Sequence, residues 1–132
     1  MSQLNLPSAY HLVSLDTVDN TNAEARRRAV EGEETTPDGT LIVAKEQTEG
    51  RGRRGRTWHS PAGNLYFSLV LRPEIPIARA AEFSFIASLA MHDALGTVGD
   101  PGHQVHCKWP NDILLNDHKV AGLLLETETT QS

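Results

Sequence analysis

Residues 49–56 read Glu-Gly-Arg-Gly-Arg-Arg-Gly-Arg, which places four of the chain's twelve Lys and Arg residues within six positions. The chain as a whole is acidic, with a formal net charge of −5. Four neighbouring guanidinium groups repel one another, and a bound anion would offset that repulsion. The three glycines keep the backbone mobile and let its N–H groups approach a ligand without a Cβ in the way. Taken alone, the segment indicates either an anion-binding loop or a solvated basic loop.

Other segments of the chain help to decide between these two interpretations. They are Asn20-Thr21-Asn22 near the start, Gln47 just before the basic loop, and Lys108-Trp109-Pro110-Asn111-Asp112 and Lys119-Val120-Ala121-Gly122 after it. In this order and spacing, the segments resemble the catalytic domain of biotin protein ligases, from about Leu12 to Glu126. The resemblance implies an α/β (α+β) fold with a mixed β-sheet and helices packed on one side, related to the fold of class II aminoacyl-tRNA synthetases.

Hydrophobic periodicity also favours a mixed fold. We expect strands at residues 11–16, 40–45, 64–71 and 105–109, a hairpin formed by 113–115 and 119–126, and helices at 21–30 and 78–95. Thr21 and Glu24 match a capping box at the start of the first helix, and Gly96 matches a glycine that ends the second. Because strands and helices interleave without a strict βαβ rhythm, the pattern predicts a mixed sheet with helices on one side.

Length and composition exclude several classes of function. With 132 residues, of which 39 % are hydrophobic, we expect one globular domain. The acidic charge disfavours binding to nucleic acid, and the cluster Arg26-Arg27-Arg28 is expected to form a solvated helix face beside acidic neighbours. No apolar run reaches the roughly 18 residues of a membrane span, and the start lacks a signal-peptide pattern. The lone Cys107 is expected to be a buried, reduced thiol, which is typical of cytoplasmic proteins.

The resemblance implies a two-step ligase reaction. Biotin and ATP first form biotinyl-5′-AMP and pyrophosphate, and the biotinyl group then moves to a lysine of a biotin carboxyl carrier protein. Since the biotin carboxylate and ATP are both anions, positive side chains must offset their repulsion. By resemblance, the catalytic residues are Lys119, Arg51 and Asp112, with Asp112 acting as general base or as the lysine-orienting group.

The same resemblance assigns the ligand sites. The biotin-binding residues are Asn20, Thr21, Gln47, Gly50, Arg51, Arg53, Lys119 and Gly122. The residues for ATP and the adenylate are Arg53, Arg56, Trp58, Asn111 and Lys119, with Asn111 near ATP and its Mg²⁺. Considered singly, some of these residues also suit purely structural roles. Thr21 could be a helix N-cap, Lys119 could be a solvent-facing residue at a strand edge, and Pro110-Asn111-Asp112 could form a turn. No His or Cys spacing predicts a tightly bound metal.

Further expectations concern the extent of the chain and its partners. Biotin ligases continue with further strands and usually a small β-barrel domain, so we expect residues 1–132 to be the N-terminal major part of the catalytic domain. With no room for a helix-turn-helix domain before Leu12, we expect no DNA binding. The oligomeric state stays open, with a homodimer among the alternatives.

Three other functions compete with biotin ligation. A lipoate ligase-like enzyme shares the fold and the reaction logic, but its Arg/Gly signature differs. A non-catalytic fragment could retain biotin or biotinyl-AMP without completing the transfer. An Arg/Gly nucleic-acid binder is disfavoured by the net charge and by the absence of aromatic residues interleaved in the loop.

Overall fold

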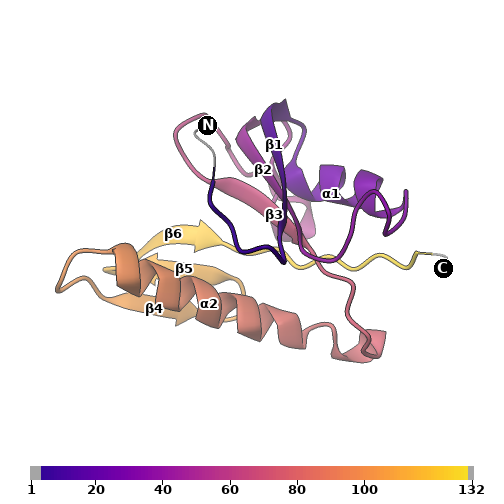
Figure 1. Cartoon of the computed structure of the whole chain (residues 1–132). Helices are drawn as coiled ribbons and strands as arrows, with labels where there is room; N and C mark the ends of the chain where they lie inside the picture. The colour runs from indigo at the N-terminus through magenta and orange to yellow at the C-terminus, as the bar shows by residue number, and fades with distance from the viewer. Residues whose placement is uncertain (1–3, 131–132) are drawn as a thin grey trace. The chain divides into compact units, whose positions relative to one another are not determined.

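In the computed structural model, which describes residues 4–130, the chain divides into two units, each with a three-stranded sheet and one α-helix (Figure 1). The first unit extends to Glu74 and also contains residues 128–130, and the second unit runs from Ile75 to Thr127. The predicted α+β class with a mixed sheet is confirmed, and the strands are shared between two small sheets. No helix among residues 4–130 combines the length and the hydropathy that crossing a bilayer requires.

The first sheet has the strand order β1-β2-β3, with β1 at His11–Val18, β2 at Thr40–Gln47 and β3 at Tyr66–Val70. β1 and β2 are parallel, whereas β2 and β3 are antiparallel, so this sheet is mixed. A parallel pair needs a crossover connection, and α1 (Thr21–Ala29) lies in the connection between β1 and β2. The central strand carries the core, since Ile42, Val43 and Ala44 are each at most 1 % exposed.

The cap of α1 differs from the sequence prediction. Asn20 is the N-cap, because its backbone is extended and its Oδ1 accepts a hydrogen bond from Ala23 N. Thr21 is buried in the first turn, with its hydroxyl oxygen 2.7 Å from Ser68 Oγ on β3. The capping box predicted from Thr21 and Glu24 is therefore wrong, and Glu24 instead accepts hydrogen bonds from arginines of the next turn.

β3 shows the alternation of a strand with one covered face. Tyr66, Ser68 and Val70 are buried, whereas Phe67 and Leu69 between them are exposed. α1 packs against both β2 and β3. The buried residues of β3 therefore face the helix, and Ser68 can reach its first turn.

The second unit contains α2 and an antiparallel meander. The short 3₁₀ helix η2 covers Ile77–Arg79, α2 covers Glu82–Val98, β4 Val105–Lys108, β5 Asp112–Leu115 and β6 His118–Gly122. The predicted turn between β5 and β6 is confirmed, because Asn116 and Asp117 both have the positive φ of a two-residue hairpin, 48° and 66°. In the same hairpin Ile113 pairs with Ala121 and Leu114 with Lys119, which leaves Val120 as the extra residue of a bulge.

Two predictions for the second unit are wrong. α2 continues past Gly96, and Gly99 N donates to Leu95 O at 2.9 Å where the helix ends. Gly96 therefore lies inside the last turn. Cys107 is exposed, because β4 is an edge strand of the second sheet.

Candidate functional site

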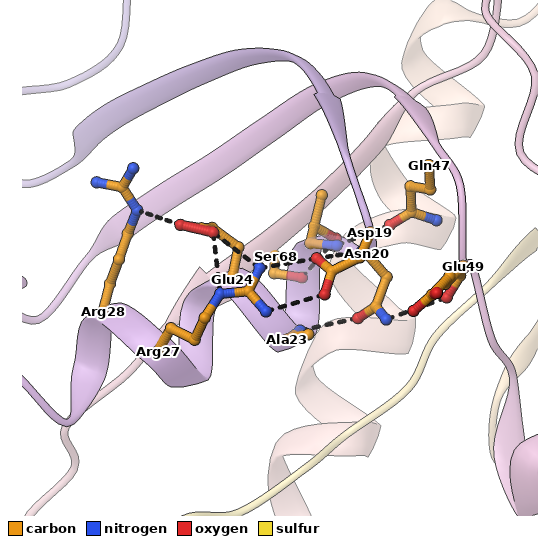
Figure 2. Close-up of polar contacts among 10 residues, drawn as sticks. Asp19, Asn20, Ala23, Glu24, Arg27, Arg28, Gln47, Glu49 and Ser68 are labelled. Atoms are coloured by element: carbon orange, nitrogen blue, oxygen red, sulfur yellow. Dashed lines mark hydrogen bonds and ion pairs between the residues drawn. The ribbon is translucent and has the colours of Figure 1, made fainter.

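Three residues predicted to bind biotin meet at one edge of the first sheet, and two of them, Asn20 and Gln47, are labelled in Figure 2. Parallel strands end at the same edge, so the ends of β1 and β2 lie together, and α1 begins directly after β1. Gln47, the last residue of β2, accepts a hydrogen bond through Oε1 from Thr21 N at 2.8 Å. Asn20 donates from Nδ2 to Glu49 O at 3.1 Å while it caps α1. The structure thus brings Asn20, Thr21 and Gln47 into one hydrogen-bonded junction.

The backbone reinforces this junction. Thr48 N donates to Val18 O at 2.9 Å and Glu49 N to Asp19 O at 2.7 Å. The chain that leaves β2 therefore runs beside the chain that leaves β1. The chain that enters the basic loop after β2 is therefore fixed by main-chain hydrogen bonds.

Asp19 and Arg27 form a two-pronged ion pair beside the junction (Figure 2). The two guanidinium nitrogens lie 2.9 and 2.7 Å from Asp19 Oδ2 and Oδ1, and Asn20 N donates to Oδ1 at 2.8 Å. The hydrogen bonds from Arg27 lower the pKa of Asp19 to about 2, against the opposing effect of burial. Arg27 also bonds Glu24, and its side chain is 51 % exposed, so the predicted solvated basic face is confirmed.

Gly50, at the start of the basic loop, is buried and has no space for a side chain. A Cβ at this position would lie 2.3 Å from Ser60 Oγ and 2.4 Å from Trp58 O. It would also lie 3.0 Å from Gln47 Nε2, which places Gly50 against the junction. The need for glycine here comes from the protein's own packing.

The basic loop folds as a hairpin, which we call the Arg/Gly hairpin (residues 50–58). Trp58 N donates to Gly50 O at 2.8 Å and Gly52 N to Arg56 O at 2.7 Å. Its tip is a 3₁₀ turn at Arg53–Gly55, where Arg54 and Gly55 have φ of 59° and 69°. The N–H of Gly52 is therefore used within the hairpin. The predicted approach of glycine N–H groups to a ligand does not hold at this position.

The hairpin places its four arginines at the surface. Arg51, Arg53, Arg54 and Arg56 are all exposed. Trp58 is half-buried at the base of the hairpin, and its carbonyl accepts a hydrogen bond from Ser60 at 2.8 Å. The arrangement offers several cationic side chains on a short, closed segment.

The remaining predicted residues lie in the second unit. Lys119 Nζ is 2.8 Å from Asp112 Oδ1, and Gly122 pairs with Asp112 across the β5–β6 ladder. Asn111 donates from Nδ2 to Leu123 O at 2.7 Å, and Leu123 N donates to Asn111 O at 2.7 Å. Asn111 thereby ties the chain after β6 to the start of β5.

Sequence reasoning missed three residues that support the first-unit junction. Asp19 holds Asn20 N, Ser60 accepts a hydrogen bond from Gln47 Nε2, and Ser68 donates to Asn22 Oδ1. The alternation of buried and exposed positions along β3 could have identified Ser68 as an inward-facing residue, since it lies midway between the buried Tyr66 and Val70. No local pattern links Ser60 to Gln47, because the contact depends on how the hairpin closes.

Comparison with known proteins places the chain in a family. The model of the biotin/lipoate A/B protein ligase family matches residues 15–132. A biotin--[acetyl-CoA-carboxylase] ligase from Paracoccus denitrificans is 49 % identical over 113 residues, 86 % of this chain and 45 % of that protein. A bifunctional ligase/repressor BirA from Bacillus spizizenii is 39 % identical over 122 residues, 92 % of this chain and 36 % of that protein. The chain thus spans less than half the length of these relatives.

Solved structures give the same result. The biotin protein ligase of Leishmania major in complex with biotinyl-5-AMP aligns with a TM-score of 0.71 at 31 % identity, over 93 % of this chain and 53 % of that one. The biotin protein ligase of Aquifex aeolicus in complex with biotin and ATP aligns with a TM-score of 0.62 at 34 % identity, over 88 % of this chain and 46 % of that one. Since the family model matches nearly the whole sequence, this chain belongs to the biotin/lipoate A/B protein ligase family.

Proposed function

We propose that this chain carries the biotin-activating site of a biotin protein ligase in the cytoplasm. A carboxylate oxygen of biotin attacks the α-phosphorus of ATP, the bond from that phosphorus to the α,β-bridging oxygen breaks, and pyrophosphate leaves. The amine of a lysine on a biotin carboxyl carrier protein then attacks the carbonyl carbon of biotinyl-5′-AMP, loses a proton and displaces AMP. Relatives named as biotin protein ligases support this reaction, and two of them were solved with biotinyl-5-AMP or with biotin and ATP.

The observation that carries the proposal is the convergence of Asn20, Thr21, Gln47 and Gly50 at one edge of the first sheet. Amide and hydroxyl groups suit the ureido ring of biotin, which presents both N–H and C=O groups. The adjoining hairpin supplies Arg51 and Arg53, whose planar guanidinium groups can bind a carboxylate or a phosphate in a two-pronged manner. Their charge offsets the repulsion between the two anionic reactants.

In this proposal, residues of the Arg/Gly hairpin and Asn111 bind ATP. Arg53 and Arg56 bind phosphate oxygens, and the half-buried Trp58 packs on the adenine. Asn111 acts near ATP and its Mg²⁺. We assign Mg²⁺ to the nucleotide substrate, because Mg²⁺ usually binds through substrate phosphates together with one or two carboxylates.

Lys119 and Asp112 serve the reacting carboxyl group. We assign Lys119 to the oxygen on which negative charge develops during attack on the α-phosphorus. The 2.8 Å ion pair supports an orienting role for Asp112, because a bound carboxylate restricts the directions in which the lysine can extend. Gly122 faces Asp112 in the ladder and keeps the neighbouring strand clear of a side chain at that point.

Calorimetric titration of the chain with biotin and, separately, with lipoate tests the proposal. We expect saturable binding of biotin at one site and binding of lipoate at least tenfold weaker. Tighter binding of lipoate would assign the chain to lipoate ligation instead. Binding of neither acid, with binding of an oligonucleotide, would overturn the proposal in favour of a nucleic-acid binder.

A further inference from the structure

The amide group of Gln47 is held at both ends, and its partners determine its orientation. A backbone N–H can only donate, so the amide atom 2.8 Å from Thr21 N must be Oε1. Nε2 therefore faces Ser60, whose Oγ is 3.0 Å away. The chemistry of the two partners thus fixes which amide atom is oxygen and which is nitrogen.

Ser60 carries this orientation to the base of the Arg/Gly hairpin. Nε2 is only a donor, so Ser60 Oγ accepts from it, and the hydroxyl proton goes to Trp58 O at 2.8 Å. The bonds form a chain with a single direction, from Gln47 through Ser60 to Trp58, and such chains reinforce one another. Ser60 is 4 % exposed, so its removal leaves a donor and an acceptor without their partner in a buried position.

Gly50 makes room for this chain of hydrogen bonds. A Cβ at position 50 would collide with Ser60 Oγ at 2.3 Å and crowd Gln47 Nε2 at 3.0 Å. Gly50 O also accepts from Trp58 N, so the same four residues close the hairpin and fix the glutamine. The end of β2 and the base of the hairpin are therefore one hydrogen-bonded unit.

We propose that Ser60 is a positioning residue that couples the biotin part of the site to the adenylate part. It fixes the amide of Gln47, a proposed biotin contact, and the backbone carbonyl of Trp58, a residue whose ring is the proposed adenine contact. The inference rests on the proposed function, from which it takes those two roles. Without Ser60, Thr21 N still selects Oε1, but Nε2 loses its acceptor. The amide plane can then swing about the remaining bond, and its N–H groups no longer point at a ureido group in one fixed direction. Ser60 thus acts on ligand affinity through Gln47.

The first test needs no ligand. The side-chain NH₂ resonances of Gln47 are recorded by ¹⁵N NMR in the 132-residue chain, in Ser60→Ala and in Ser88→Ala. Ser88 is a matched control, because it is also 4 % exposed and its hydroxyl also donates to a backbone carbonyl, Pro110 O. We expect Ser60→Ala to shift these resonances and to speed their proton exchange with water by roughly tenfold, as expected for the loss of one buried hydrogen bond. Unchanged Gln47 resonances in Ser60→Ala would overturn the inference.

The second test measures biotin affinity in a double-mutant cycle. We expect Ser60→Ala to weaken biotin binding by roughly tenfold and Ser88→Ala to change it less than twofold. In a Gln47→Ala background, Ser60→Ala should have less than a twofold further effect, because Ser60 acts through Gln47. Additive losses would show that Ser60 acts independently and would contradict the proposal.

The two tests separate this inference from the proposed function. If the parent chain does not bind biotin, the proposed function and its biotin part fail, whereas the NMR comparison still decides whether Ser60 orients Gln47. If Ser60→Ala does not melt cooperatively, Ser60→Cys takes its place, since cysteine has a similar size and is only a weak acceptor. We then expect the same direction of change in both measurements, and no change would overturn the inference.

Discussion

Lys119 Nζ lies 2.8 Å from Asp112 Oδ1, and the two residues stand on neighbouring strands of one hairpin. Lys119 pairs with Leu114, two positions along β5 from Asp112. Side chains two positions apart share a face of a strand, so Lys119 and Asp112 meet diagonally across the ladder. The lysine is therefore directed by a carboxylate of the neighbouring strand, next to the bulge at Val120. Lys119 is 41 % exposed on β6, an edge strand of the second sheet, so the edge interpretation left open by the sequence also fits its surroundings, with Asp112 as a charged partner.

Lys119→Ala should slow formation of biotinyl-5′-AMP by roughly a hundredfold, because one charged contact to a desolvated oxyanion contributes about 3 kcal/mol. Single-turnover assays with biotin and MgATP measure the effect. His118→Ala is the control, since His118 is the exposed neighbour on the same strand. A loss of less than twofold for Lys119→Ala would show that the assigned role is wrong.

Asp19→Asn should destabilise the chain at neutral pH and have less effect in acid. The folded-state pKa of Asp19 is about 2, below the ordinary value of 3.8, so its ionised form stabilises the fold above pH 3.8. That stabilisation is lost as the pH falls toward 2. With the side chain 31 % exposed, we expect about 1 kcal/mol after screening by solvent.

Urea unfolding of both proteins at pH 7 and near pH 2 checks this expectation. Asn keeps an oxygen that can accept from Asn20 N, so the comparison isolates the charge. The two free energies of unfolding should converge in acid. An equal difference at both pH values would mean that the ion pair with Arg27 is not its cause.

Gly50→Ala should destabilise the first unit by about 1–3 kcal/mol, the usual cost of overpacking. Its Cβ would meet Trp58 O at 2.4 Å, and a backbone atom cannot move aside cheaply. Gly52→Ala is the matched control, because its Cβ would be 4.0 Å from its nearest neighbour, Arg56 O. Thermal melts of the two variants should differ clearly, and equal melting temperatures would rule out the packing argument.

Backbone exchange in the Arg/Gly hairpin should slow when biotin and ATP bind. The hairpin is narrow, and its four exposed arginines repel one another until an anion offsets their charge. Hydrogen exchange of the amides of residues 52–56 is the measurement, with the buried amides of β2 as internal control. Unchanged exchange at saturating ligand would contradict a ligand-binding role for the hairpin.

The sequence predicted the elements whose signals are local. The three strands of the first sheet and the Asn116-Asp117 turn follow from apolar runs and turn residues, and all are observed. Asn20 and Thr21 are both good caps, and local chemistry cannot choose between them. The burial of Thr21 against Ser68, 47 positions away, decides in favour of Asn20.

Local sequence motifs also predicted part of the candidate site. The motifs identified Asn20, Thr21, Gln47 and Gly50, which the first unit brings together. Their support by Asp19 and Ser60 depends on ion pairing and hairpin closure, which have no sequence periodicity. The exposure of Cys107 likewise depends on strand order, since a residue type gives no information on which strand lies at an edge.

We propose that this chain activates biotin, and mass-spectrometric detection of biotinyl-5′-AMP after incubation of the chain with biotin and MgATP tests this most directly. We expect biotinyl-5′-AMP together with an equal amount of pyrophosphate, and a clear decrease of both in Gln47→Ala. Biotin binding without release of pyrophosphate, or adenylation of lipoate in preference to biotin, would contradict it.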